Sequence, residues 1–445
     1  MAASGRVLVI EERSCPETNQ LWDAVRDEGY EIVTMPLGRT LEQAAAAQRP
    51  DAVLLNMIAA DLGAERNRYL DAASRLTVAT GGRRMPVIGI GDVEGGGRPL
   101  GMADVLPRPL SAGRLIGRIA SLSRLATMQA ELRRRMETGG RFGIDVPNLE
   151  SAFADRDASI LVIGNGGRFL GFEAALARMA TLTGAFTVAT ARDYLARRSF
   201  DLVLLDLPID EATALTVELR RNSAWYALPV VAFAPEAGSQ AASETIEAAH
   251  RAGVTEVMVG SYEGRDLLER VHAAINENRL REQLKSIYTQ ARHFASNDAL
   301  TGLFARGYLM EHLSRLVREA RRAGDRFAVV GFHLAHLVDL NKKYGYAGGD
   351  HLLRQIGMLI ARLVRGEDLA ARAGAGRFAL LLPAAGFEEA NRVSTRIGAI
   401  IRATRFVIPD AEAPVSIDLD VGHAIWTASD DAESLLARAF GPQVR

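Results

Sequence analysis

One pattern of short apolar runs occurs twice in the first two thirds of this 445-residue chain. The two sets are RVLVIEE (6–12), PDAVLLN (50–56) and MPVIGIG (85–91), then SILVIGN (159–165), FDLVLLD (200–206) and LPVVAFA (228–234). Matching runs lie 143 to 153 residues apart, so the pattern indicates a domain-sized duplication and not a solenoid repeat. Strand-length runs separated by helix-length amphipathic stretches are typical of βαβ units with buried parallel strands. The sequence therefore predicts two doubly wound α/β domains, over residues 5–135 and 158–278.

A linker and a helical stalk follow the two predicted domains. RRRMETGGRFGIDVPNLE passes from a basic helix end to Gly and Pro, which predicts a linker over 136–157. Residues 279–296 contain no Gly or Pro and predict the stalk. Leu280, Leu284 and Ile287 recur there at spacings of four and three, so one face of the stalk is expected to dock or pair.

Residues 297–445 are expected to form a third domain in which helices and strands alternate. The expected strands lie near 327–334, 378–383 and 414–423, and the expected helices near 306–323, 348–364 and 386–403.

Composition limits the classes of partner. The chain has 53 Lys and Arg against 54 Asp and Glu, so no overall charge attracts nucleic acid or an anionic membrane. Cys15 is the single cysteine, which fits a reducing compartment. The N-terminal apolar run is too short for a signal peptide, and no stretch approaches the ~18–20 apolar residues of a membrane span. We expect a cytoplasmic protein without a nucleic-acid partner or a membrane span.

The first repeat carries polar residues at the ends of its expected strands. Glu11 and Glu12 follow the first strand, Asn56 ends the third, Gly91 follows the fourth, and Arg108 lies in PRPL after the fifth. The arrangement resembles a response-regulator receiver domain, which has a flavodoxin-like, CheY-like fold. That family holds Mg²⁺ with an acidic pair and phosphorylates an Asp that ends the third strand, assisted by a hydroxyl and a Lys. Because an amide cannot attack phosphorus as a carboxylate does, this domain is not expected to be phosphorylated.

The second repeat keeps the acid that the first has lost. Asp206 stands at the position of the phosphoacceptor, but Gly164 and Asn165 replace the metal pair. Ala234 and Gly260 replace the hydroxyl and the Lys. With these groups absent, Asp206 is only a possible phosphoacceptor, and an exposed strand-end Asp on a scaffold domain is the favoured interpretation.

The third domain opens with DALTGLFAR (298–306), and LNKKYGYAGGD (340–350) follows. Both segments resemble those of GGDEF diguanylate cyclase domains, which have a cyclase-like α/β fold. The resemblance places Asn341 and Asp350 where the family reads the guanine of GTP. An amide and a carboxylate can pair with the guanine edge, so a residual guanine site is one interpretation and surface capping is the other.

The catalytic positions of that family have lost their acids. The family holds Mg²⁺ with one carboxylate at the end of the first strand and another in its GG(D/E)EF hairpin. His333 stands at the first position, and in RAGAGRF the hairpin reads Gly374, Ala375, Gly376 and Arg377. Because Mg²⁺ prefers oxygen ligands, we expect no bound metal and no catalytic residue.

A zinc site is not favoured either. His333 and His336 are three residues apart, which in a strand places them on opposite faces, and no Cys or converging acid pair lies nearby. Both are expected to be partly exposed polar residues.

RGED (365–368) begins nine residues before Gly374, where the cyclase family binds its inhibitory product, cyclic di-GMP. The resemblance implies that Arg365, Asp368 and Arg396 bind this ligand. An Arg can stack on guanine and donate to O6 and N7, while an Asp accepts from N1–H and the 2-amino group. A salt bridge at the helix surface is the alternative.

The order of the domains resembles receiver–receiver–GGDEF response regulators, and the altered sites are most like those of a non-cyclase effector. The resemblance implies a cyclic di-GMP-binding adaptor in phosphorelay-like cell-cycle signalling. It further implies a homodimer through the receiver domains, recruitment to a cell pole and delivery of a client to regulated proteolysis. The ligand would cross-link the GGDEF domain to another domain or protomer. A weakly active diguanylate cyclase and a scaffold that binds no nucleotide are the alternatives.

Overall fold

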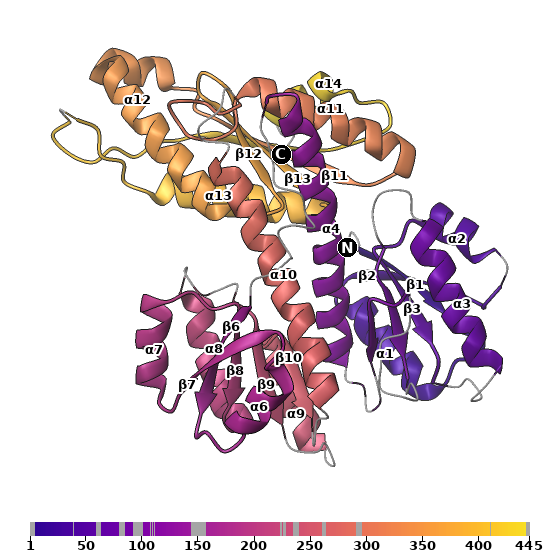
Figure 1. The fold of residues 1–445 in the computed structure, drawn as a ribbon. Coiled ribbons are helices and arrows are strands. Elements are labelled where there is room, and N and C mark those ends of the chain that lie inside the picture. The colour runs from indigo at the N-terminus through magenta and orange to yellow at the C-terminus, as the bar shows by residue number, and fades with distance from the viewer. Residues whose placement is uncertain are drawn as a thin grey trace.

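The computed structural model describes residues 5–38, 40–58, 64–79, 85–91, 101–106, 108, 110, 112–143, 157–222, 225, 228–234, 240–259, 264–290, 296–409 and 411–441. They form three sheets with helices packed on their faces (Figure 1).

The first sheet is parallel, in the order β2-β1-β3-β4-β5. Its strands are β1 (Gly5–Ile10), β2 (Tyr30–Met35), β3 (Ala52–Asn56), β4 (Val87–Ile90) and β5 (Asp104–Leu106). Its helices are α1 (Pro16–Asp27), α2 (Leu41–Gln48), α3 (Ala64–Ala79) and α4 (Ala112–Gly140). β3 and β4 are buried along their whole length, because helices cover both faces of the sheet.

The second sheet repeats this topology, in the order β10-β9-β8-β6-β7. Its strands are β6 (Ala158–Gly164), β7 (Ala180–Ala185), β8 (Leu202–Asp206), β9 (Val230–Ala234) and β10 (Glu256–Val259). Its helices are α6 (Phe169–Leu176), α7 (Val188–Arg197), α8 (Ile209–Arg221), α9 (Gln240–Arg251) and α10 (Gly264–Gln290). The predicted pair of parallel α/β sheets is confirmed.

The third sheet is antiparallel, in the order β12-β13-β11-β14. Its strands are β11 (Phe327–His333), β12 (Leu369–Gly374), β13 (Arg377–Pro383) and β14 (Asp420–Ile425). Its helices are α11 (Arg306–Ala323), α12 (Leu337–Leu363), α13 (Phe387–Ala403) and α14 (Ala432–Phe440).

Two expected elements of the third domain were misplaced. The strand expected at 414–423 is β14, at Asp420–Ile425, because it pairs with β11 from His333↔Asp420 to Ala328↔Ile425. The helix expected at 348–364 belongs to α12, which begins at Leu337 and is kinked at Gly345, where φ is 72°.

Helix α4 joins the domains. It continues to Gly140, so the linker predicted over 136–157 begins inside a helix. Its far end packs on α11 of the third domain, while other parts contact α9 and α10 of the second (Figure 1). The predicted stalk falls partly in α10, but the side chains of its expected docking face, Leu280, Leu284 and Ile287, lie outside the described residues, as does Gly260.

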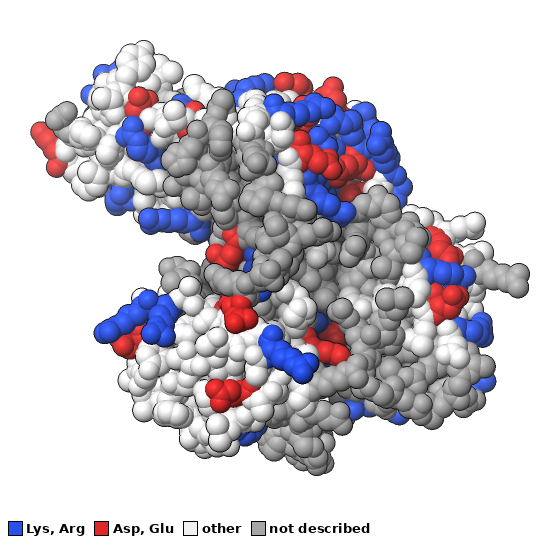
Figure 2. All heavy atoms as spheres, in the orientation of Figure 1, with Lys and Arg blue, Asp and Glu red and all other residues white. Residues whose placement is uncertain are grey.

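Charge is mixed on the face shown in Figure 2, with basic side chains concentrated near α11. On α11, Arg306 pairs with Glu433 at 3.1 Å and Arg318 lies 3.8 Å from Glu311. Among the helices in the described part of the chain, none combines the length and the apolar character that crossing a membrane demands.

A buried carboxylate joins the first two domains. Glu256 on β10 contacts Arg114 of α4 at 3.3 Å and Arg270 of α10 at 2.8 Å. Burial alone would raise the pKa of Glu256, but the guanidinium groups of Arg270, Arg114 and Arg118 lower it to about 2. This pairing stabilises the folded chain above pH ~4.5, and the contribution is lost as pH falls toward 2.

Glu256→Gln is expected to destabilise the folded chain by ~3–5 kcal/mol at pH 7, because buried arginines lose their counter-charge. Glu218→Gln is the matched control, since it breaks an exposed pair with Arg192 and should change little. Thermal unfolding measures both variants, and equal midpoints would contradict this account of the interface.

Candidate ligand-binding site

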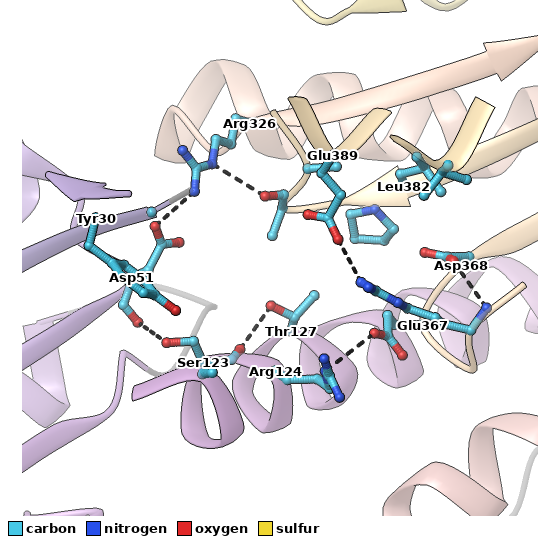
Figure 3. Close-up of a pocket in the computed structure, with 17 residues that line it drawn as sticks. Tyr30, Asp51, Ser123, Arg124, Thr127, Arg326, Glu367, Asp368, Leu382 and Glu389 are labelled. Atoms are coloured by element: carbon cyan, nitrogen blue, oxygen red, sulfur yellow. Dashed lines mark hydrogen bonds and ion pairs between the residues drawn. The ribbon is translucent and has the colours of Figure 1, made fainter. Parts of the chain in front are cut away.

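A cavity of about 170 Å³ lies between the first and third domains (Figure 3). The first domain lines it with Gly5, Tyr30, Asp51, Ala120, Ser123, Arg124 and Thr127. The third domain lines it with Arg326, Arg365, Glu367, Asp368, Leu382, Pro383, Ala384, Ala385, Glu389 and Val393. The structure thus brings two of the three predicted ligand residues, Arg365 and Asp368, to the wall of an interdomain cavity.

The turn between α12 and β12 holds these two residues together. The Asp368 carboxylate accepts a hydrogen bond from the backbone N–H of Arg365 at 3.1 Å, and the Asp368 N–H donates to the Arg365 carbonyl at 3.2 Å. Asp368 is buried, whereas the Arg365 side chain is 46% exposed and pairs with Glu389 on α13 at 2.5 Å. The salt bridge considered as the alternative interpretation therefore exists, but it is made with Glu389.

The ionisation of Asp368 is unusual. Burial, and next the neighbouring charge of Glu367, raise the pKa of Asp368 to about 7, although Arg365 acts in the opposite direction. The carboxyl group therefore changes charge near neutral pH. When ionised it is a hydrogen-bond acceptor facing a partly enclosed space.

Each arginine at the cavity has an acidic neighbour. Arg326 contacts Asp51 at 3.0 Å, and the remaining pairs are Arg124 with Glu367 at 3.9 Å and Arg365 with Glu389. A ligand anion would have to exchange with these carboxylates. An exposed ion pair contributes only ~0–1 kcal/mol, so exchanging Glu389 for a guanine or phosphate group costs little.

Arg396 does not line the cavity. It lies exposed on α13, and its Nη2 donates to the carbonyl of Leu363 at 3.1 Å, two residues before Arg365. It therefore lies beside the turn and supports the end of α12.

The sequence did not point to Asp51, Arg124, Arg326 or Glu389 as part of this site. Asp51 and Arg124 come from another domain, more than 200 residues earlier in the chain. Glu389 lies in an acidic pair at the start of α13, a pattern that also serves to stabilise a helix N-terminus.

The predicted guanine residues lie on either side of the kink in α12. A Cβ atom at Gly349 would lie 1.9 Å from Oδ1 of Asn341, so only glycine lets the Asn341 amide approach this backbone. Asp350 is the next residue and is exposed. The amide of Asn341 therefore lies close to the backbone of Gly349, next to the exposed carboxylate of Asp350.

The positions predicted for the cyclase metal ligands carry side chains that do not fit Mg²⁺. His333 ends β11 opposite Arg377 in the sheet register, and the N–H of Leu334 donates to the carbonyl of Gly376 at 2.8 Å. The strand end and the hairpin are therefore adjacent, but they present an imidazole and a guanidinium group where hard oxygen ligands would be needed. His333 lies 3.6 Å from Asp420, and His336, the residue before α12, lies 3.9 Å from Asp339. Within the described ranges no three His, Cys, Asp or Glu side chains are grouped to hold a metal ion.

An amide–carboxylate pair occupies the expected receiver site of the first domain. Asn56 donates from Nδ2 to Glu11 at 2.7 Å, and Trp22 donates to the same oxygen at 3.4 Å. Glu12 pairs instead with Arg68 at 3.2 Å. The two acids therefore have protein partners, and Gly91 and Arg108 provide no hydroxyl or Lys.

An arginine occupies the corresponding site of the second domain. Arg168 donates from Nε to Asp206 at 2.6 Å, and its guanidinium carbon lies 4.4 Å from the ring centre of Phe233. Asp206 is buried, so the expected exposed Asp was wrong. A Cβ atom at Gly164 would lie 2.1 Å from the carbonyl oxygen of Asp206, so no acid fits there without a backbone shift. Asn165 and Ala234 supply no metal-binding acid or hydroxyl.

Comparisons with known proteins agree with this layout. Residues 295–440 match the family described as diguanylate cyclase, GGDEF domain. The response regulator PleD of Caulobacter vibrioides is 26% identical over 453 residues, covering 98% of this chain and 95% of PleD. The diguanylate cyclase TpbB of Pseudomonas aeruginosa is 33% identical over 159 residues, covering 36% of this chain and 35% of TpbB.

One similar solved structure is the GGDEF domain of DgcB from Caulobacter crescentus in complex with c-di-GMP. It is 22% identical, with a TM-score of 0.32, and covers 33% of this chain and 86% of that domain. The third domain is a GGDEF-type, cyclase-like α/β domain. The similarity to PleD over 98% of the chain supports a PleD-like architecture of receiver-like and GGDEF domains.

Asn56→Asp is expected to place two carboxylates within hydrogen-bond distance and to destabilise the chain by ~1–3 kcal/mol at pH 8. The pKa of the new acid would lie above its unfolded value, so the loss should shrink toward pH 4.5. Thermal unfolding at both pH values, with exposed Asn391→Asp as control, checks this prediction. Equal midpoints of the Asn56 variant and wild type at pH 8 would refute it.

Proposed function

We propose that this chain is a non-enzymatic cyclic di-GMP effector of the response-regulator type, most similar in its altered sites to the non-cyclase protein PopA. The observation that carries the proposal is the cavity at which Arg365 and Asp368 of the GGDEF domain face the first receiver-like domain. The PleD-like architecture and the GGDEF domain support a role in signalling related to cyclic di-GMP.

The chemistry of the turn suits a guanine base. Arg365 can donate to O6 and N7 or stack on the ring, and ionised Asp368 can accept from N1–H and the 2-amino group. The cavity is smaller than the ~300–1,000 Å³ of pockets that enclose a drug-sized ligand. We therefore place one guanine end of the dinucleotide in the cavity and the rest along the domain boundary. Arg124 and Arg326 lie on that boundary as phosphate partners.

The absence of cyclase activity is part of the proposal. His333, Gly376 and Arg377 supply no carboxylate at the family's metal positions, and phosphoryl transfer depends on the charge of its metal ions. By resemblance, the liganded protein would form a homodimer through its receiver-like domains. It would be recruited to a cell pole and deliver a client to regulated proteolysis.

Two other functions are consistent with particular observations. The approach of Asn341 to Gly349 keeps a guanine-reading arrangement, which favours a weakly active diguanylate cyclase. The ion pairs that satisfy the arginines of the cavity favour a scaffold that binds no nucleotide.

Titration calorimetry with cyclic di-GMP separates the effector from the scaffold. We expect micromolar binding by the full chain and loss of binding in Arg365→Ala, because the guanidinium group supplies the main donors to the base. Arg362→Ala, at an exposed position near the end of the same helix, is the control and should bind like the wild type. Absence of heat with the wild type would exclude the effector function.

Incubation with GTP and Mg²⁺ tests the cyclase alternative. We expect no cyclic di-GMP product, because both metal-binding carboxylates are replaced. Product formed by the wild type and lost in Asn341→Ala would show that the domain is an enzyme.

The pKa of Asp368 predicts pH-dependent binding. With a pKa of about 7, the Asp368 carboxyl group is mostly ionised at pH 8 and mostly protonated at pH 6. The association constant for cyclic di-GMP should therefore fall about tenfold over this range. Asp368→Asn should bind more weakly at pH 8 and lose the pH dependence. A flat profile for the wild type would show that Asp368 does not accept from the ligand.

A further inference from the structure

Helix α4 of the first domain contacts the backbone of the ligand turn. Arg135 is fully buried, and its Nη2 donates to the carbonyls of Glu367 at 3.1 Å and Asp368 at 2.9 Å. These are the two residues that follow Arg365 and Gly366 in RGED. The turn that carries the proposed ligand residues is thus held by an arginine more than 200 residues away in sequence.

The position of Arg135 is itself fixed. Its Nε donates to Glu131 at 2.7 Å, and Glu131 also accepts from Arg134 at 2.9 Å and lies 3.2 Å from Nε2 of His312 on α11. Glu131 and His312 are completely buried, and Thr138 contacts the other ring nitrogen of His312 at 3.2 Å. Because the donor is held on several sides, it can fix the two carbonyls of the turn in one direction.

We propose that Arg135 is a positioning residue for the ligand site, through which the docking of α4 sets the affinity of the cavity for cyclic di-GMP. This inference rests on the proposed function. Fixing the carbonyls of residues 367 and 368 fixes the local backbone, and the Asp368 carboxylate is already bound to the Arg365 N–H in the same turn. Without Arg135, two buried carbonyls lose their donor and the turn can open, so the ligand must also order it.

This account differs from a cross-link that the ligand itself creates. The contacts of Arg135 and the 3.9 Å contact of Arg124 with Glu367 hold the first domain against the turn through protein atoms alone. The cavity is therefore preorganised, and the ligand would bind at a domain interface that the protein's own contacts form.

The test uses the full chain and four proteins: wild type, Arg135→Met, Arg135→Lys and the exposed control Arg133→Gln. Met keeps the volume without a donor, whereas Lys keeps the charge and one donor group. Calorimetry with cyclic di-GMP, well below each unfolding temperature, should show at least tenfold weaker binding for the Met variant. The Lys variant should lose three- to tenfold and the control nothing.

Hydrogen exchange provides a readout that a merely structural role would not change. The N–H groups of Arg365 and Asp368 should exchange faster in Arg135→Met, while those in the middle of α11 keep the wild-type rate. No heat with the wild type overturns the proposed function and this inference with it. If the wild type binds cyclic di-GMP and both Arg135 variants bind it with the same affinity, the inference is overturned but the proposed function is not. If the Met variant does not fold, wild-type affinity in the Lys variant is enough to reject it.

Discussion

The docking of the first domain on the third depends on Glu131, a carboxylate that has no access to water. Burial alone would raise the pKa of Glu131, yet His312, Arg135 and Arg134 hold it well below its usual range. An isolated buried carboxylate would cost several kcal/mol. Since His312 belongs to the third domain, Glu131 is satisfied in full only when α4 is docked there. The same docking places Arg135 within hydrogen-bond distance of the carbonyls of Glu367 and Asp368.

A second buried carboxylate is paired with arginines near the other end of α4. Glu256 of the second domain is buried among Arg114 and Arg118 of α4 and Arg270 of α10. One helix therefore carries two buried charge networks, each completed by a different domain. Such networks stabilise little beyond apolar packing of the same volume, but they are intolerant of a wrong partner. They specify one docking geometry, and the interdomain cavity is a product of that geometry.

Much of the fold could be predicted from local pattern. Buried strands such as β3 and β8 are continuous apolar runs, and α11 agrees with the predicted helix at 306–323. The position of β14 could not be predicted, because the length and register of its partner β11 decide which residues pair.

The candidate site could be predicted only in part. RGED could be predicted because it begins nine residues before Gly374, where the family that the domain resembles binds cyclic di-GMP. Arg135, Asp51 and Arg124 could not be found in the same way, because long-range docking and not sequence spacing brings them to the turn. Arg168 was also missed, since nothing in the sequence shows that a loop arginine reaches Asp206.

The altered sites share a physical logic. A carboxylate without a bound metal ion needs a hydrogen-bond donor or a cation, and a buried carboxylate needs it most. Glu11 takes a donor from Asn56, and Asp206 takes the guanidinium group of Arg168. In each case the partner belongs to the same domain, so the carboxylate is paired within that domain. The turn at 365–368 is different, because Arg365 is half exposed and its partner Glu389 is exchangeable. Of the sites compared in the described chain, this turn is the one whose charges a ligand can rearrange at low cost.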